Sequence, residues 1–307
     1  MMVEINNFKR KFTITNSTIA IIVNYNDAQR TINLVKDIID YQALKNVIVV
    51  NNNSTDNSIE ILSDFEHPKY LIINSEINGG YGYGNNLGIK KANEIGADFV
   101  LICNPDIVFQ ENTLNSMIKK IGSDTKCSII NARETHLGNF AWKYTNTFQD
   151  IISASIIMNK LFKSRYYDEV YFKNKSSAIV DVIQGSFLLI SLPLMIKYGM
   201  YDEDFFLYEE EKVLYKKFID HGYYALTDLD VNYEHHHVDS KKITINQLVT
   251  SKRRLLQSKL LYLMKYRHLN KQKLNVAKLF FDLTIIEMYI YSSFLIVIQS
   301  LKRINNE

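Results

Sequence analysis

The chain is poor in cysteine and in net charge, and both shortages exclude classes of protein. Two cysteines occur among the 307 residues, Cys103 and Cys127, and they lie in or beside apolar runs without the spacing of a metal site. This usage is typical of a reduced, cytosolic chain whose cysteines pack in the core. The formal net charge of +3 is too small to indicate a nucleic-acid-binding surface. We therefore expect no nucleic acid among the partners.

The sequence also lacks a secretory signal, internal repeats and low-complexity linkers. Its first 17 residues are polar and basic, and they contain no apolar stretch of the kind that a signal peptide requires. We therefore expect a cytoplasmic protein. A hydrophobic content of 47% and a charged content of 22% are ordinary for a globular enzyme, and the length suffices for one large α/β domain or for a domain with appendages.

The apolar run Phe99 to Cys103 stops abruptly at Asn104-Pro105-Asp106. Such a run predicts a strand that is buried on both faces, as in a parallel sheet covered by helices. Pro105 ends the strand because it has no N–H group to donate. Asp106 then follows the carboxyl end of the strand, where open α/β sheets bind ligands. A carboxylate there suits a divalent cation that carries phosphates, and an ordinary turn is the alternative for this motif alone.

Strands alternate with helices over the first half of the chain. We predict strands at 19–23, 47–50, 70–73 and 99–103, which indicates a doubly wound, mostly parallel α/β sheet with its polar loops along one edge. Asn51-Asn52-Asn53 in one loop offers amides to a pyrimidine base, although an Asn-rich turn explains it equally. The glycine-rich run from Gly79 to Gly84 lets backbone approach a ligand closely, ahead of a helix predicted from Leu87 to Ile95. That run matches neither a dinucleotide-binding fingerprint nor a P-loop.

The second half mixes aromatic and acidic runs. Between 131 and 180 the periodicity is lost, and aromatic residues such as Trp142 suit either an acceptor platform or a packed lid. A strand is predicted from Val182 to Ser191, and a shorter one from Tyr223 to Thr227. Glu209-Glu210-Glu211 opens a helix, where the macrodipole favours negative charge. Alternatively, a carboxylate partly desolvated by the preceding aromatic residues serves as a general base.

Three adjacent histidines follow the last predicted strand. In an extended chain His235 and His237 share a side. His235 can complete the cation site of Asp106, because imidazole nitrogens ligate Mn²⁺ or Mg²⁺ when carboxylates are few. A solvated histidine cluster is the alternative.

The tail is helical and increasingly apolar. The segment Leu279 to Leu301 nearly reaches bilayer length, but Asp282 and Glu287 would be costly inside a span. We therefore expect a helix that lies in the membrane interface. Alternatively, this helix forms a homodimer contact or packs in the core. The third alternative is that it spans the membrane.

Taken in order, these motifs resemble glycosyltransferase family 2, the inverting nucleotide-sugar enzymes of the GT-A fold, and most closely its bacterial rhamnosyltransferase-like members. The resemblance covers roughly Ile19 to Lys265. It rests on Val23-Asn24-Tyr25-Asn26, Asn51-Asn52-Asn53-Ser54-Thr55-Asp56, Gly80-Tyr81-Gly82-Tyr83-Gly84-Asn85-Asn86, Asn104-Pro105-Asp106, Asp202-Glu203-Asp204-Phe205-Phe206 with Glu210-Glu211, and His235 with Ser240.

The resemblance implies a division of the chain and a set of site residues. A GT-A domain would occupy 1–245, with a nucleotide-sugar half at about 17–130 and an acceptor half at about 131–245, before a C-terminal helical region at 246–307. The implied nucleotide-sugar site consists of Val23, Tyr25, Asn51, Asn53, Gly82, Gly84, Asn85, Asn104 and Asp106. Asp106 and His235 would hold Mn²⁺ or Mg²⁺. Gln184, Gly185, Trp142 and Asp202 would lie on the donor or acceptor side. Glu211 stands where the family has its catalytic base, with Glu210 before it.

Three positions depart from the family pattern. Asn51 and Glu211 stand where the family usually has Asp, and Val213 replaces a further acidic residue. With these departures, the resemblance still implies transfer of a sugar, rhamnose from dTDP-rhamnose being the first expectation. The acceptor would be a hydroxyl of a bacterial surface polysaccharide or lipid-linked glycan precursor, at the inner face of the cell membrane.

Other functions remain open at the level of sequence. One is a transferase that uses another donor such as a UDP-hexose, and one is a non-catalytic nucleotide-sugar-binding or assembly protein. A sugar nucleotidyltransferase is disfavoured, because it needs Arg or Lys in a glycine-rich loop after the first strand, where this chain has Asn24-Tyr25-Asn26-Asp27.

Overall fold

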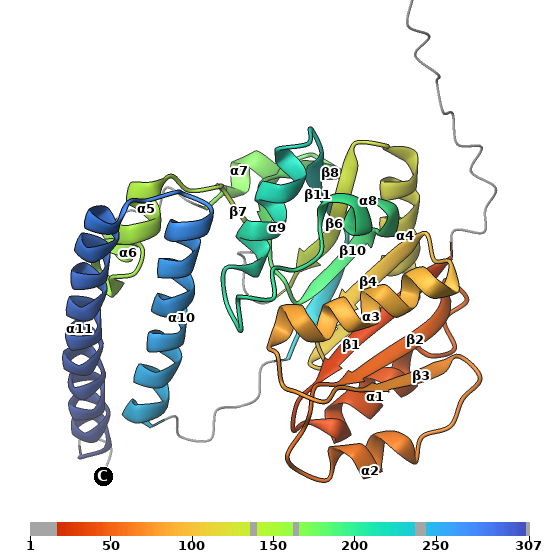
Figure 1. The fold of residues 1–307 in the computed structure, drawn as a ribbon, viewed down its shortest axis with the longest axis horizontal. Helices are drawn as coiled ribbons and strands as arrows, with labels where there is room; N and C mark the ends of the chain where they lie inside the picture. Colours follow the sequence, from red (N-terminus) through yellow and green to blue (C-terminus); the bar gives the residue numbers. More distant parts are fainter. Residues whose placement is uncertain (1–16, 136–139, 162–165, 237–243, 305–307) are drawn as a thin grey trace, which may run out of the picture.

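The computed structural model describes residues 17–135, 140–161, 166–236 and 244–304, and it has a mixed, mostly parallel sheet at its centre (Figure 1). Nine strands of the described chain form this sheet in the order β3-β2-β1-β4-β10-β6-β11-β5, and β8 pairs with β11. Their bounds are β1 Thr18–Asn24, β2 Leu44–Asn51, β3 Tyr70–Asn74, β4 Phe99–Cys103, β5 Ile107–Phe109, β6 Cys127–Glu134, β8 Ser177–Val180, β10 Phe187–Ser191 and β11 Tyr224–His235. Two short strands, β7 Ala141–Trp142 and β9 Val182–Ile183, form a second sheet.

Helices cover both faces of the large sheet, as the unbroken apolar strands predict. Along β1, Ala20 and Ile22 belong to one hydrophobic cluster, and Ile19 and Ile21 belong to the other. The helices are α1 Ala28–Ile38, α2 Ser58–Ser63, α3 Tyr81–Ile95, α4 Glu111–Ser123, α5 Thr147–Ile152, α6 Ile156–Leu161, α7 Glu169–Phe172, α8 Leu192–Tyr198, α9 Glu210–Ile219, α10 Ile245–Lys265 and α11 Lys271–Ile304. The prediction of a doubly wound α/β fold is confirmed.

Three strands run against the common direction of the sheet: β10 between β4 and β6, and β5 and β8 beside β11. The four strands β3, β2, β1 and β4 are parallel, so their carboxyl ends meet at one edge. β10 is antiparallel to both β4 and β6, whereas β11 is parallel to β6 and antiparallel to β5. The pairing of β5 with β11 brings Ile107 opposite His235. A residue from each half of the chain thereby reaches the same edge.

Three predicted boundaries were wrong. Helix α3 begins at Tyr81 and not at Leu87, so Gly82 and Gly84 are helical. Glycine is a poor helix former, but here the helix packs so tightly on the sheet that a Cβ at Gly84 would lie 2.8 Å from Val23 Cγ1. The strand expected from Val182 to Ser191 breaks into β9 and β10, which belong to different sheets. β11 continues beyond Thr227 to His235 through an irregular register.

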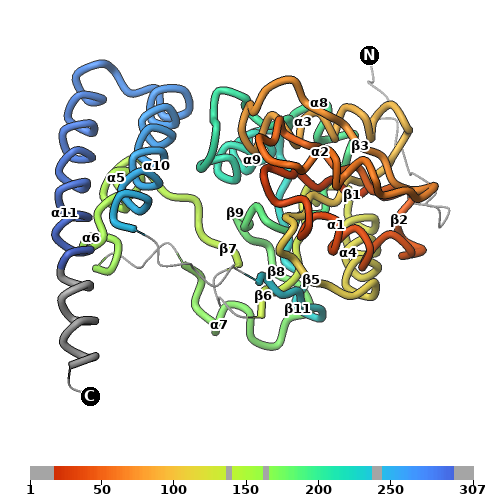
Figure 2. The backbone as a smooth tube through the Cα atoms, turned by 90° about the horizontal axis from the view of Figure 1, so that it is seen from below, coloured from red at the N-terminus to blue at the C-terminus, as the bar shows by residue number. Residues whose placement is uncertain are grey.

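The C-terminal helices form an antiparallel pair beside α5 and α6, and the two views in Figures 1 and 2 agree on this arrangement. Their contact is apolar and includes Leu256, Leu263, Ala277 and Phe281. Within the described residues, no helix combines the length and the apolar character that a bilayer span needs. Glu287 has a structural partner, because its carboxylate accepts hydrogen bonds from Ser155 Oγ and from the first backbone N–H groups of α6.

The close approach of α3 to β1 yields a stability prediction. A Cβ at Gly88 would collide with the Ile21 side chain. We expect Gly88→Val to lower the free energy of unfolding by more than about 2 kcal/mol, because overpacking a core forces backbone or side-chain displacement. Chemical denaturation measures this difference. Asn93→Val is the matched control, since it places the same side chain at an exposed position of the same helix, where a change within about 0.5 kcal/mol is expected. Equal losses in the two variants would contradict the proposed packing.

Candidate active site

A cavity of about 790 Å³ opens between the sheet and the helices of the second half of the chain. The ends of β4 and β11 contribute Asn104 and His235, and the segment between β9 and β10 contributes Gln184-Gly185-Ser186. The start of α9 contributes Glu209 to Lys212, and further walls come from Tyr81, Trp142, α6 and α10. A cavity of this size lies within the range that small-molecule substrates occupy.

Asp106 and His235 are brought together by the backbone. The His236 N–H donates to the Asp106 carbonyl oxygen at 2.8 Å, and the Asp106 Oδ1 to His235 Nε2 distance is 3.2 Å. Burial would raise the pKa of the Asp106 carboxyl, but the hydrogen bond and the charge of His235 outweigh burial and lower this pKa below its ordinary value. Asp106 is thus held as a carboxylate beside a nearly buried imidazole.

The pair fits two positions of a divalent-metal site. Neighbouring ligands of an octahedral Mg²⁺ with bonds of about 2.1 Å lie about 3 Å apart, close to the 3.2 Å between Asp106 and His235. Gln184 Nε2 lies 3.4 Å from His235 Nδ1, and the Gln184 Oε1 is buried without a hydrogen-bond partner among the described residues. With the Gln184 amide turned over, Oε1 would accept from the Nδ1–H and leave His235 Nε2 as the ligand, a common outer contact of metal-binding histidines.

Among the residues that the structure describes, the protein side chains do not supply a full set of metal ligands. No group of three or more His, Cys, Asp or Glu residues there is arranged to hold a metal ion. Mg²⁺ is commonly bound by one or two carboxylates together with substrate phosphates and water, so this ligand set suits a metal that arrives with a phosphate substrate. His237 and Ser240, which the sequence motifs included, lie outside the described residues.

The asparagines at the ends of β1 and β2 form hydrogen bonds with α1, with the loop after β2 and with the end of β3. Thr31 Oγ1 donates to Asn24 Oδ1 at 2.9 Å, and Asn24 Nδ2 donates to Ser54 Oγ at 3.1 Å. Asn51 Nδ2 donates to Asn74 Oδ1 at 3.1 Å, while its Oδ1 accepts from the Ser54 N–H at 3.3 Å. These bonds tie the loops after three parallel strands into one surface. Tyr25 remains 47% exposed on that surface and accessible to a ligand.

The structure gathers part of the expected site around the cavity and places the rest outside its lining. The predicted residues in the lining are Asn104, Trp142, Gln184, Gly185, Glu210, Glu211 and His235. Val23, Gly82, Gly84 and Asn85 serve the packing of α3, with Asn85 Nδ2 bound to the Tyr81 carbonyl oxygen at 3.0 Å. Asn53 has a left-handed backbone, with φ of 54°. Asp202 forms an ion pair with Lys265 at 2.7 Å and accepts a hydrogen bond from Tyr266, so it binds the end of α10.

A strained turn delivers the two candidate base residues to the cavity. Tyr208 and Glu209 precede α9 with φ values of 74° and 70°. Residues other than glycine rarely adopt such positive φ values. Glu211 Oε1 then accepts a hydrogen bond from the Gly185 N–H at 3.2 Å. A Cβ at residue 185 would lie 2.8 Å from that oxygen, so glycine is required for the contact.

The acidity of the three consecutive glutamates differs strongly. Burial, and then the charge of Glu211, raises the pKa of Glu210 to about 8. Burial raises the pKa of Glu211 as well. Glu209 is equally buried, but Lys212 and Lys259 lower its pKa to about 2. Neighbouring carboxyl groups whose pKa values are shifted in opposite directions are typical of acid–base sites.

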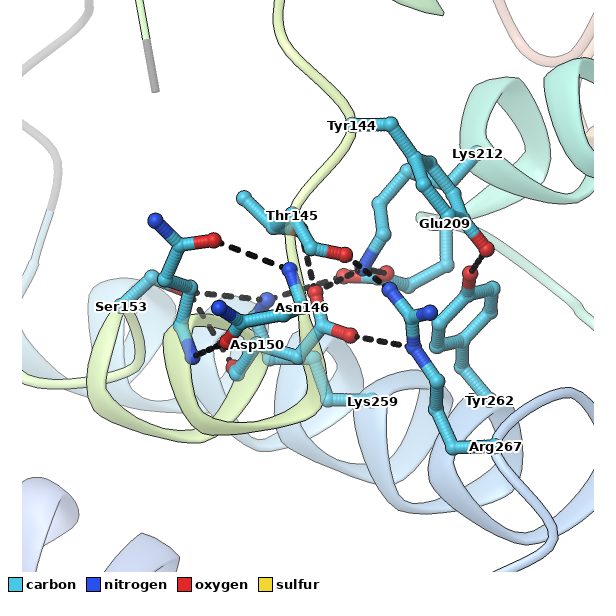
Figure 3. A network of polar contacts seen from close by, with 11 residues as sticks. Tyr144, Thr145, Asn146, Asp150, Ser153, Glu209, Lys212, Lys259, Tyr262 and Arg267 are labelled. Atoms are coloured by element: carbon cyan, nitrogen blue, oxygen red, sulfur yellow. Dashed lines mark hydrogen bonds and ion pairs between the residues drawn. The ribbon is translucent and has the colours of Figure 1, made fainter. Parts of the chain in front are cut away.

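The network that keeps Glu209 ionised was missed from sequence (Figure 3). Lys212 Nζ lies 2.7 Å from both Glu209 Oε2 and Asp150 Oδ1, and Lys259 Nζ lies 3.0 Å from Glu209 Oε1. Arg267 Nε contacts Asp150 Oδ2 at 2.8 Å. The spacing of Glu209 and Lys212 was the available signal, but Asp150 comes from a stretch without periodicity.

Comparison with known proteins bears on the family and the fold of the chain. Residues 19–190 match the model of Glycosyl transferase family 2. The low-salt glycan biosynthesis hexosyltransferase Agl10 of Haloferax volcanii is 28% identical over 207 residues, which are 67% of this chain and 62% of that protein. The rhamnosyltransferase WbbL of Escherichia coli (strain K12) is 24% identical over 141 residues, which are 43% of this chain and 51% of that protein.

The matched part of this chain thus spans about half to three fifths of the length of these curated relatives. Among solved structures, the mannosyltransferase PcManGT from Pyrobaculum calidifontis, in complex with GDP-Man and Mn²⁺, is similar with a TM-score of 0.56 and 15% identity over 90% of this chain and 74% of its own. This likeness shows the GT-A fold. With the family model matching more than half of its residues, the chain belongs to glycosyl transferase family 2.

Proposed function

We propose that the protein transfers a sugar, with inversion, from a nucleoside-diphosphate donor to a hydroxyl of a glycan acceptor. The observation that carries the proposal is the shared cavity, whose lining includes both His235, which contacts Asp106, and the buried carboxyl groups of Glu210 and Glu211. A cation site and a carboxyl group of raised pKa are the two elements that such a displacement requires.

Asp106 and His235 would hold Mn²⁺ or Mg²⁺, which neutralises charge on the departing diphosphate when it is bound. Gln184 orients the imidazole. Tyr25 and the loops tied by Asn51 would contact the nucleoside. In an in-line displacement, the acceptor oxygen bonds to the anomeric carbon as the bond from that carbon to the diphosphate oxygen breaks, and the configuration inverts.

Glu211 would take the proton from the attacking hydroxyl. The Gly185 N–H fixes one of its oxygens, and a carboxylate of raised pKa is a stronger base than an ordinary one near neutral pH. Glu210 is the alternative base, since its Oε1 is buried without a hydrogen-bond partner among the described residues. We assign the base role to Glu211 because its backbone contact holds it in a defined position.

The donor and the acceptor are proposed at a finer level. WbbL, a relative, is named a rhamnosyltransferase, which supports dTDP-rhamnose as the first donor to test. Agl10 is named a glycan biosynthesis hexosyltransferase, which supports a glycan as the acceptor, and a surface polysaccharide or lipid-linked glycan precursor is the acceptor that we propose. A UDP-hexose is the alternative donor. A non-catalytic nucleotide-sugar-binding protein is the alternative function, and measurable turnover excludes it.

We also propose that α11 contacts the inner face of the cell membrane peripherally. An apolar stripe along this helix remains exposed, and it consists of Val276, Leu279, Leu283, Ile286 and Ile290. Lys271, Lys273 and Lys278 lie on the same helix, and basic residues beside an apolar face favour an anionic lipid surface. A homodimer seam is the alternative use of the stripe.

Substitution of the proposed base and substitution of the proposed cation ligand should affect two different measurements. We expect Glu211→Gln to reduce sugar transfer at least about 100-fold, the order of a lost general base, while leaving donor binding intact. Asp106→Asn should instead lose the Mn²⁺-dependent thermal stabilisation by a nucleotide sugar. A melting-temperature panel with dTDP-rhamnose and UDP-hexoses, followed by a transfer assay, measures both. Full activity of Glu211→Gln would move the base to Glu210, and absence of any stabilisation of the unmodified protein would contradict the function.

The raised pKa of Glu210 predicts a pH-dependent stability. In the unfolded chain this carboxyl ionises near 4.5, whereas in the folded protein it holds its proton up to about pH 8. The folded state therefore binds more protons between these values, and the free energy of unfolding should fall as the pH rises from about 5 to 8, by on the order of 3 kcal/mol. Urea denaturation without divalent cations measures this slope. Glu210→Gln should flatten the slope, whereas the exposed Glu94→Gln should retain it, and identical slopes in both variants would contradict the assignment.

The membrane contact predicts that Leu283→Asp releases the protein from vesicles of anionic lipid. A charge in the centre of the apolar stripe removes buried area and adds repulsion. Vesicle flotation measures binding, and Glu94→Gln serves as the control. The stripe is a dimer seam if the unmodified protein does not bind vesicles and sedimentation shows a dimer that Leu283→Asp dissociates.

A further inference from the structure

The cavity has a second charged wall, which the proposed donor chemistry does not use. Lys160 from α6, Lys212 from α9, and Lys252 and Lys259 from α10 all line it. Figure 1 places α6 and α10 away from the sheet, whereas Asn104, Gln184 and His235 come from the ends of sheet strands or the segment between them. Three of the lysines, Lys160, Lys252 and Lys259, therefore come from helices away from the sheet, whereas His235 of the proposed cation site comes from a sheet strand.

Only part of the positive charge of this wall is paired with carboxylates of the described chain. Asp150 and Glu209 are shared among Lys212, Lys259 and Arg267. Glu287, the nearby carboxylate on α11, is occupied by Ser155 and the start of α6. In the described part of the chain, no carboxylate forms an ion pair with Lys160 or Lys252. Lys160 and Lys252 are thus the two lysines of this wall that have no carboxylate in ion-pair contact among the described residues.

Lys252 and Lys160 are placed to bind a ligand. The Lys252 ammonium donates to the Ala154 carbonyl oxygen, and Glu287 attracts it without forming an ion pair. Burial, and then repulsion from Lys259, lowers the pKa of Lys252. Burial likewise lowers the pKa of Lys259. Lys160 is exposed and its ammonium lies 5.3 Å from the centroid of the Tyr291 ring. An anion between these lysines would relieve their repulsion at no cost in reorganising the wall.

We infer that the acceptor carries a phosphate or diphosphate group beside the sugar that bears the attacking hydroxyl, and that Lys160, Lys252 and Lys259 bind this group. The inference rests on the proposed function, because Glu211 sets where the hydroxyl must lie. Glu210 and Glu211 line the cavity together with these lysines, so one acceptor can reach both. Two ammonium groups without an ion-pair partner among the described residues match a phosphate or diphosphate ester better than the single charge of a carboxylate. The donor diphosphate has its own partners at Asp106 and His235.

Binding of inorganic pyrophosphate in buffer free of divalent cations tests the subsite by calorimetry. Without metal, the Asp106 carboxylate repels this probe, so binding reports on the lysines. We expect Lys252→Met and Lys160→Met each to weaken binding at least about fivefold, the effect of losing one charged hydrogen bond. Lys278→Met, at an exposed position of α11 outside the cavity, and Asp106→Asn should not weaken it. Absence of pyrophosphate binding, or equal weakening by Lys278→Met, would overturn the inference.

Separate readouts distinguish this subsite from the donor site. Lys160→Met changes an exposed side chain, so it tests the inference even if Lys252→Met does not fold. Both variants should keep the thermal stabilisation by a nucleoside diphosphate with Mn²⁺. Loss of that stabilisation in both would mean that the lysines serve the donor, and it would overturn the subsite. Its absence in the unmodified protein, with pyrophosphate binding intact, would count against the proposed function and not against the anion site.

The source of the phosphate is resolved by two further probes. One is glucose 1-phosphate in solution, and the other is phosphatidylcholine vesicles that contain a long-chain prenyl diphosphate. Binding of the first that depends on Lys252 supports a water-soluble acceptor. Retention on the vesicles that depends on Lys252, and that exceeds retention on phosphatidylglycerol vesicles of equal charge, supports a lipid-linked acceptor. Binding of neither probe would overturn the inference.

Discussion

The geometry of the cavity depends on the buried ion network around Glu209. This carboxylate and Asp150 join α9 to α5 and α10 through Lys212, Lys259 and Arg267, and all five groups are buried or nearly so. Buried ion pairs contribute little net stability, because desolvation offsets their attraction, but removing one partner leaves an uncompensated charge at a cost of about 3–5 kcal/mol. The network therefore fixes one arrangement of the helices more than it strengthens the fold.

That arrangement also supports the strained turn before α9. Tyr208 and Glu209 both have positive φ values. This backbone conformation is sparsely populated, and it persists only when the surrounding structure stabilises it. Here the ion pairs of the Glu209 carboxylate with Lys212 and Lys259 stabilise the turn. The turn directs Glu210 and Glu211 into the cavity, where burial raises both pKa values. One glutamate thus stays ionised, whereas its two neighbours have the raised pKa values that the proposed proton transfer requires.

The cavity joins two different parts of the fold. The sheet supplies a rigid edge, where the β5–β11 pairing places His235 beside Asp106 and the asparagines lock the loops after β1, β2 and β3. The helical side supplies the carboxyl groups and the lysines. The proposed cation site, the two buried glutamates and the lysines therefore surround one space, which suits the proposed substrates, since these carry charge at both ends.

Much of the fold was predictable because its signals are local. The apolar runs located β1 to β4 to within a few residues, because a strand buried on both faces needs consecutive apolar side chains. Asp106 could be placed at the edge of the sheet, since Pro105 ends the strand. Residues such as Asn104, Trp142, Gln184, Glu211 and His235 followed from the order of motifs, and all of them line the cavity.

The sequence by itself thus determined the parallel half of the sheet, the family and several residues that line the cavity. Only the tertiary structure decided that Gly82 and Gly84 are helical, because the close approach of α3 to the sheet is a contact between distant segments. It also decided that Asp202 binds the end of α10 and that Asp150, 62 residues away in sequence, binds Lys212. Such pairs carry no periodic signal, since burial and charge neutralisation depend on what the fold brings together.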